Sequence, residues 1–178
     1  MNFQLLHIQV LAAGLLVTVL IGFIIKKQNN ILTQDDSKNG FVSYNHAASK
    51  EEADELGKKW RSSPIYFQAV KNIIYTDYVW MIFFGATIFY GLSIGFNYAA
   101  GERKLIFAAG MVLLTVAVSI DFLQDTAIYR HLTKNIIADL RFLTTTKFIL
   151  LGVAIVTALS GIVLYRSHLL HESFWQWE

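Results

Sequence analysis

The chain has no cysteine and a single proline, Pro64, among its 178 residues. The absence of cysteine excludes disulfides, thiolate metal sites and cysteine nucleophiles. The sequence also lacks a phosphate-binding loop, a nucleophile elbow and a metalloprotease helix. Its basic residues belong to no groove-reading motif, so nucleic acid is not an expected partner.

Long stretches of the chain contain no charged residues and consist mostly of apolar ones. Hydrophobic residues make up 54% of the sequence, aromatic residues 14%, and the mean hydropathy is +0.44. A bilayer core about 30 Å thick needs about 20 mostly apolar helical residues to cross it. The test for a membrane protein is therefore whether uncharged runs reach that length.

Four runs meet or approach this length: Leu5–Ile25, Val79–Tyr98, Leu105–Ile120 and Phe148–Tyr165. They predict an all-α, polytopic membrane protein, an up-down bundle of four transmembrane helices forming one membrane domain over residues 1–178. We expect the spans to cover about 5–25, 77–98, 105–125 and 147–166. A cleaved signal peptide is a poor explanation of the first run, because its lysines follow the apolar stretch and the stretch is long.

The distribution of positive charge predicts the orientation. The segments 26–78 and 121–147 together carry twelve Lys and Arg, whereas the ends of the chain and the 99–104 turn carry three. Loops rich in Lys and Arg stay in the cytoplasm. We therefore expect loops 26–76 and 126–146 on the cytoplasmic side of a bacterial inner membrane, and both termini on the outer side. Trp80, Trp175 and Trp177 are the expected interfacial anchors.

The long segment between the first two spans contains two helix-start signals. Residues 28–48 are polar and without periodicity, which predicts an exposed loop. Ser49 followed by Glu52 has capping-box spacing and predicts a short helix from Lys50 to about Trp60. Ser63 and Pro64 predict a second start. Residues 64–75 are expected to be an amphipathic helix at the cytoplasmic interface, either bent from the second span or continuous with it.

Two aspartates stand where the third span leaves the lipid. Asp121 is about 25 Å along a helix from Lys104 and Asp125 about 31 Å, so both fall near the inner boundary. Four-residue spacing places Asp121, Gln124, Asp125 and Ile128 on one face, followed by Leu132. Charged groups at this depth normally face partners inside the bundle. The candidate cations are Lys147, Arg141 and Lys71, with Asp77 and Tyr78 as further polar neighbours.

The stretch "DFLQDTAIYRHL", followed by "TTTKFILLGVAIVTAL", resembles a pattern in a family of small bacterial four-helix membrane proteins without an assigned activity. The matching positions are Asp121, Asp125, Ile128, Leu132 and Lys147. Gln124 departs from the pattern, which has an acid there. The resemblance implies the four-helix fold and no activity.

Other histidines and small residues have ordinary explanations. His168, His171 and Glu172 could hold a metal only weakly and belong to an exposed tail, His131 is expected to be a solvated loop residue, and His7 an interfacial one. No mid-membrane histidine pair suggests haem. Gly91 and Gly95, and Ala154 and Ala158, predict close helix packing, within the chain or between copies.

The sequence thus favours a non-enzymatic membrane bundle without a cofactor or metal, with structural, accessory or partner-binding roles in a homo-oligomer or membrane complex. One alternative is a small transporter, channel subunit or proton-coupled protein that uses Asp121 and Asp125. Another is a divalent-metal enzyme acting on lipid headgroups. For the aspartates themselves, a salt-bridged helix end that docks the third and fourth spans is the competing explanation.

Overall fold

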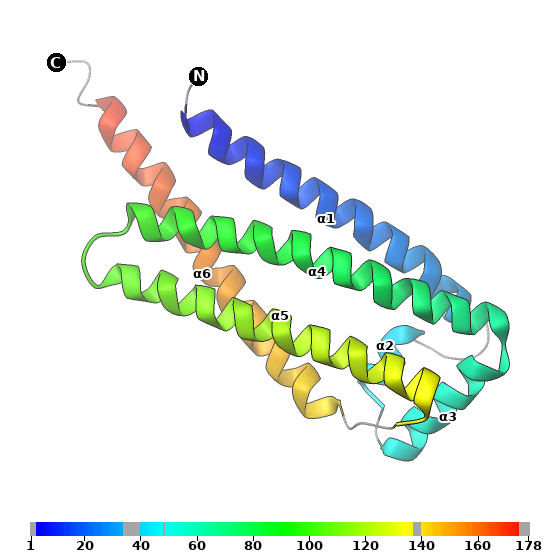
Figure 1. Ribbon diagram of the computed structural model, residues 1–178. Helices are drawn as coiled ribbons and strands as arrows, with labels where there is room; N and C mark the ends of the chain where they lie inside the picture. Colours follow the sequence, from blue (N-terminus) through cyan, green and yellow to red (C-terminus); the bar gives the residue numbers. More distant parts are fainter. Residues whose placement is uncertain (1–2, 34–39, 48, 137–139, 175–178) are drawn as a thin grey trace.

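Six helices make up the described part of the chain, which contains no strand (Figure 1). A computed structural model describes residues 3–33, 40–47, 49–136 and 140–174, with side chains from Leu6 to Ser167. The helices are α1 (Phe3–Thr33), α2 (Phe41–Asn45), α3 (Lys50–Ser62), α4 (Pro64–Tyr98), α5 (Arg103–Lys134) and α6 (Arg141–Phe174).

Four of these helices are long and apolar enough to cross a membrane: Leu6–Thr33, Pro64–Tyr98, Arg103–Lys134 and Arg141–Ser167. The predicted all-α bundle of four spans is confirmed, and the chain is a multi-pass membrane protein. The helices are longer than the predicted spans. The 35 residues of α4 extend over about 52 Å, well beyond the thickness of the hydrocarbon.

The excess length projects at the end of the bundle that α2 and α3 cover, hereafter the capped end (Figure 1). The opposite end, hereafter the turn end, carries the short connection of residues 99–102 between α4 and α5. Residues 64–75 form the continuous start of α4, one of the two predicted alternatives. Their buried side chains Ala69, Val70, Ile73 and Ile74 join a protein core with α3 and α5.

The prediction of an exposed loop over residues 28–48 is wrong for much of that segment. Helix α1 continues to Thr33, and Leu32, Phe41 and Tyr44 are buried. The two aromatic rings of α2 stack on Trp60 of α3, with centroids 6.2 and 5.6 Å from it. These few buried apolar residues therefore hold the polar stretch against the bundle.

Both helix-start predictions are confirmed. Ser49 is the N-cap of α3, where its hydroxyl accepts a hydrogen bond from the Glu52 amide at 3.3 Å. Pro64 lies in the first turn of α4, where its missing N–H leaves no helical bond unmade. The chain therefore turns from α3 into α4 within one residue, Ser63.

Helix α4 is the centre of the bundle and packs against α1, α5 and α6, whereas α1 packs mainly against α4. Small residues bring α4 and α6 close together near the turn end. A Cβ added at Gly91 would lie 3.3 Å from the Ala158 Cβ, and one at Gly161 only 2.7 Å from the Gly95 Cα. The predicted tight packing is found here within the chain.

The interior contains two apolar cores. One lies at the capped end and includes Trp60, Ile73 and Ile128. The other lies toward the turn end and includes Leu92, Phe107 and Leu114. Between these cores, buried polar and charged residues of α4, α5 and α6 interrupt the apolar interior.

Candidate functional site

Six side chains from three helices form this level, which we name the polar layer: Asp77 on α4, Asp121, Gln124 and Asp125 on α5, and Thr144 and Lys147 on α6. Their places follow from helical spacing, because positions 121, 124 and 125 share the face of α5 that continues into buried Ile128. The five site residues expected from the sequence are all brought together.

Lys147 and Asp121 form the ion pair of the polar layer. The lysine Nζ donates to Asp121 Oδ1, and the two side chains are 11% and 13% exposed. The ammonium also lies 4.9 Å from the centroid of the Phe148 ring. Of the three candidate cations, Lys147 is thus the partner, while Lys71 lies over the Tyr75 ring.

Gln124 links α5 to α6 and is fully buried. Its Nε2 donates to Thr144 Oγ1 at 2.5 Å, and the threonine hydroxyl donates to the Leu140 carbonyl at 2.9 Å. A carboxylate at position 124 could not donate to the threonine and would add another acid to the layer. The amide at position 124 therefore has a structural reason.

Asp125 is the most deeply placed acid and is 1% exposed. Its carboxyl group faces that of Asp77 on α4 within hydrogen-bonding reach. Among the described residues, no donor reaches its Oδ2 atom. Two carboxyl groups therefore meet across the α4–α5 interface, and the ammonium nearest to them is already paired with Asp121.

The polar layer leaves little room for a ligand. The cavity beside Asp121 and Lys147 has a volume of about 10 Å³, which is the space of one water molecule at most. The described residues contain no group of three or more His, Cys, Asp or Glu side chains positioned to hold a metal ion. Nothing in this geometry favours the divalent-metal enzyme.

The expected interfacial anchors are only partly within the described residues, since Trp175 and Trp177 lie outside them. The indole N–H of Trp80 donates to the Thr18 carbonyl at 3.1 Å, and its ring stacks on Phe84 at 4.5 Å. Trp80 therefore joins α1 to α4. The side chains of His168, His171 and Glu172 also lie outside the described part of the chain.

A second polar network lies at the capped end and was missed in the sequence. The prediction of a solvated loop position for His131 is wrong, because the residue is in α5 and fully buried. Its Nδ1 is hydrogen-bonded to the Tyr44 hydroxyl, and its Nε2 lies 3.2 Å from Asp54 Oδ1. Arg61 donates to the His131 carbonyl at 3.0 Å.

The roles in this chain of hydrogen bonds follow from Asp54, which as a carboxylate can only accept. The Nε2–H of His131 therefore donates to it, and in the neutral ring Nδ1 accepts from the Tyr44 hydroxyl. Burial, followed by the negative charge of Asp54, raises the pKa of Tyr44 to about 12, so its hydroxyl stays protonated. The network fastens α2 and α3 to the end of α5.

A third group of ring side chains joins three helices toward the turn end. His7 Nδ1 is 2.6 Å from the Tyr90 hydroxyl, and the His7 ring packs edge-on against Tyr165, with centroids 5.5 Å apart. These contacts hold the start of α1 against α4 and α6.

Comparison with protein-family models, curated proteins and solved structures finds no match to this chain.

Proposed function

We propose that the protein is a proton-coupled membrane protein in which Asp77 and Asp125 share one proton across the α4–α5 interface. The observation that carries this proposal is the Asp125 carboxyl group, which is almost fully buried against a second carboxyl group with one oxygen lacking a donor. A proton between the two groups supplies the missing hydrogen bond and removes one negative charge.

Charge balance supports the same proposal. Asp121 on α5 and Lys147 on α6 are the charged groups that act on the pair, and they neutralise each other. If Asp77 and Asp125 were both ionised, two adjacent negative charges would remain inside the bundle. Two unit charges 4 Å apart interact by about 4 kcal/mol at an effective dielectric constant of about 20. Adjacent buried carboxyl groups therefore retain a proton.

Loss of this proton has a mechanical consequence, because the two carboxyl groups belong to different helices. Repulsion between Asp77 and Asp125 would separate α4 from α5 at the polar layer. A proton taken up or released there is thus coupled to the width of the interface. Such coupling is what a small transporter, channel subunit or other proton-coupled protein requires.

The second candidate is a structural or accessory bundle, a subunit of a homo-oligomer or of a membrane complex. The observation favouring it is that the remaining polar-layer side chains bond to one another and leave a cavity of only about 10 Å³. In that case the shared proton would be a fixed part of the structure, and the α4–α5 distance would not respond to pH.

Two measurements separate these candidates. Infrared spectroscopy of the purified protein at neutral pH should detect a protonated carboxyl group, and its band should disappear in Asp125→Asn but persist in Glu102→Gln, which removes an exposed acid. Absence of that band in the wild type would refute the shared proton. Spin labels at exposed Val79 of α4 and Leu123 of α5 should then move apart as the pH rises, and should stay fixed in Asp125→Asn.

We also propose that the capped end lies on the cytoplasmic side of a bacterial inner membrane, because it carries most of the Lys and Arg residues. The chain has no native cysteine, so single cysteines can be introduced at exposed Lys50 and Glu102. A membrane-impermeant thiol reagent should label position 102 from outside and position 50 only after the membrane is opened. The reverse pattern would invert the topology.

A further inference from the structure

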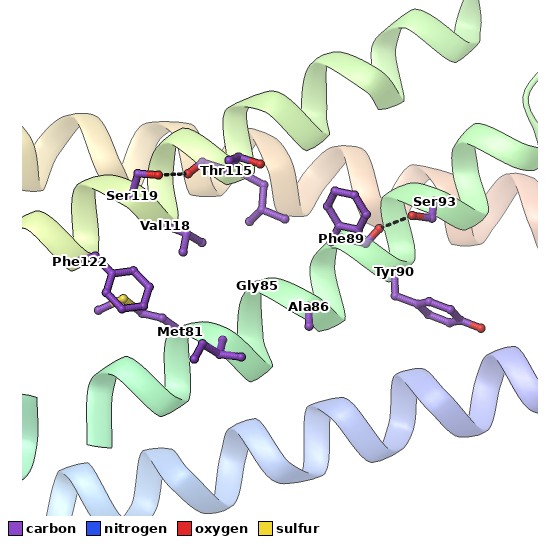
Figure 2. Close-up of a pocket in the computed structure, with 12 residues that line it drawn as sticks. Met81, Gly85, Ala86, Phe89, Tyr90, Ser93, Thr115, Val118, Ser119 and Phe122 are labelled. Atoms are coloured by element: carbon purple, nitrogen blue, oxygen red, sulfur yellow. Dashed lines mark hydrogen bonds between the residues drawn. The ribbon is translucent and has the colours of Figure 1, made fainter. Parts of the chain in front are cut away.

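A groove of about 600 Å³ lies between α4 and α5. Figure 2 shows its walls: Ala86 and Ser93 on α4, Thr115 and Ser119 on α5, with Met81 and Phe122 at the end nearest the polar layer. Ala86 and Ser119 are exposed, so the groove opens on the outer surface of the spans. We name it the α4–α5 groove.

The hydroxyl groups in the walls are already bonded within the protein, that of Tyr90 to His7 on α1 and the others within their own helices. Ser93 donates to the Phe89 carbonyl at 2.9 Å, Thr115 to that of Met111 at 2.9 Å, and Ser119 to that of Thr115 at 2.8 Å. No wall hydroxyl therefore needs a donor or acceptor from a ligand. The groove suits an apolar occupant.

The groove is long. The lining residues of α4 run from 81 to 93, about 18 Å along the helix. A linear hydrocarbon chain can lie along this whole length.

The two ends of the groove differ in charge. At the capped end, Phe122 stacks on Tyr78 with ring centroids 5.0 Å apart, and the acids of the polar layer follow directly. At the turn end, Phe96 continues the same face of α4 beyond Ser93, and the Lys104 ammonium lies 5.4 Å from the centroid of its ring. The Lys104 ammonium is therefore placed to attract a phosphate at the turn end of the groove.

We propose that the α4–α5 groove binds one acyl chain of an anionic phospholipid, with the lipid phosphate against Lys104 at the turn end. The chain lies along Ala86 and Ser119 and stops at the stacked rings of Tyr78 and Phe122. This site is separate from the proton shared by Asp77 and Asp125, so either proposal can fail without the other.

The test is retention of lipid by the full-length protein, purified in a non-ionic detergent and analysed by native mass spectrometry. Dioleoyl phosphatidylglycerol and dioleoyl phosphatidylcholine are added at equal concentration. The wild type should retain one phosphatidylglycerol in preference to phosphatidylcholine. Ala86→Phe combined with Ser119→Phe fills the groove from both walls and should abolish this retention. Ala109→Phe, at an exposed alanine of α5 outside the groove, should leave it unchanged.

The headgroup contact is tested separately. Lys104→Gln should weaken phosphatidylglycerol retention about fivefold and leave phosphatidylcholine retention as it was, since one basic side chain near the surface contributes about that much. Lys134→Gln removes an equally exposed charge from the opposite end of α5 and should have no effect.

Three outcomes would overturn the proposal. Unchanged retention in the groove-filled variant would place the lipid elsewhere on the surface. Equal retention of the two lipids by the wild type would exclude the anionic headgroup. A shift of a wild-type oligomer to monomer on filling the groove, without any change in lipid, would assign the groove to a second copy of the chain.

Discussion

Replacing Asp125 with Asn should make the protein more stable than the wild type as the pH rises. The amide has nearly the shape of the carboxyl group, can donate to Asp77, and carries no charge at any pH. Under the proposed function, the wild type instead holds a proton on the pair when it folds. Exchange of a buried polar residue usually destabilises a protein, so the expected gain is a specific sign of the shared proton.

The size of the effect follows from proton linkage. In the unfolded chain an aspartic acid loses its proton near pH 3.9. Above about pH 4, folding of the wild type takes up one proton, so its free energy of unfolding falls by about 1.4 kcal/mol per pH unit. The Asn variant takes up none at this site. Between pH 5 and pH 7 the variant should therefore gain about 2.7 kcal/mol relative to the wild type.

Unfolding in mixed micelles, followed by circular dichroism at several pH values, measures this difference. Subtracting the two curves removes the titration of every other group, and Glu102→Gln serves as the control at an exposed acid. A difference that stays constant from pH 5 to pH 7 would mean that folding takes up no proton there. A variant that loses stability relative to the wild type over this range would refute the shared proton outright.

The remaining predictions concern the capped end and the ion pair. Tyr44→Phe should lower the free energy of unfolding by about 1 kcal/mol through loss of the hydrogen bond to His131. Because burial raises the pKa of Tyr44 to about 12, the wild type should lose stability between pH 10 and 12, and Tyr44→Phe should not. Unfolding curves at alkaline pH measure this difference. Gly57→Ala should destabilise by about 1–3 kcal/mol despite the better helix propensity of alanine, since the added Cβ would lie 2.5 Å from His131 Cε1; a higher melting temperature would contradict this. Asp121→Asn should cost about 3 kcal/mol by stranding the ammonium of Lys147, and Lys147→Met in the same chain should recover most of it; equal losses in the single and double variants would argue against a buried pair.

Most of the bundle follows from the sequence because length and hydropathy decide which segments cross a membrane. The helix starts at Ser49 and Pro64 could also be predicted from the sequence, since capping depends on neighbouring residues. The structure of the capped end could not be predicted in this way, because α2 is held by Phe41 and Tyr44, which stack on Trp60 of another helix. Such tertiary contacts leave no local period.

Five of the six members of the polar layer were named from the sequence, since helical spacing groups Asp121, Gln124 and Asp125 and charge selects Lys147; Thr144 was missed. The same buried face also contains His131, two turns beyond Gln124, so its burial could have been predicted from spacing. What the sequence could not tell is which acid takes the lysine. That choice depends on how α4 and α6 approach α5, which puts Asp77 opposite Asp125.

The close approach at the turn end has a mechanical meaning. Gly95 leaves no space over Phe107, where an added Cβ would overlap the ring, and four residues connect α4 to α5 just beyond. Helices α4 and α5 are thus held closely together at the turn end. Asp77 lies 18 residues from Gly95, a lever of about 27 Å, so a rotation of about 5° at this end displaces its carboxyl group by about 2 Å. A small rotation at the turn end is therefore enough to move the facing carboxyl groups of Asp77 and Asp125 apart.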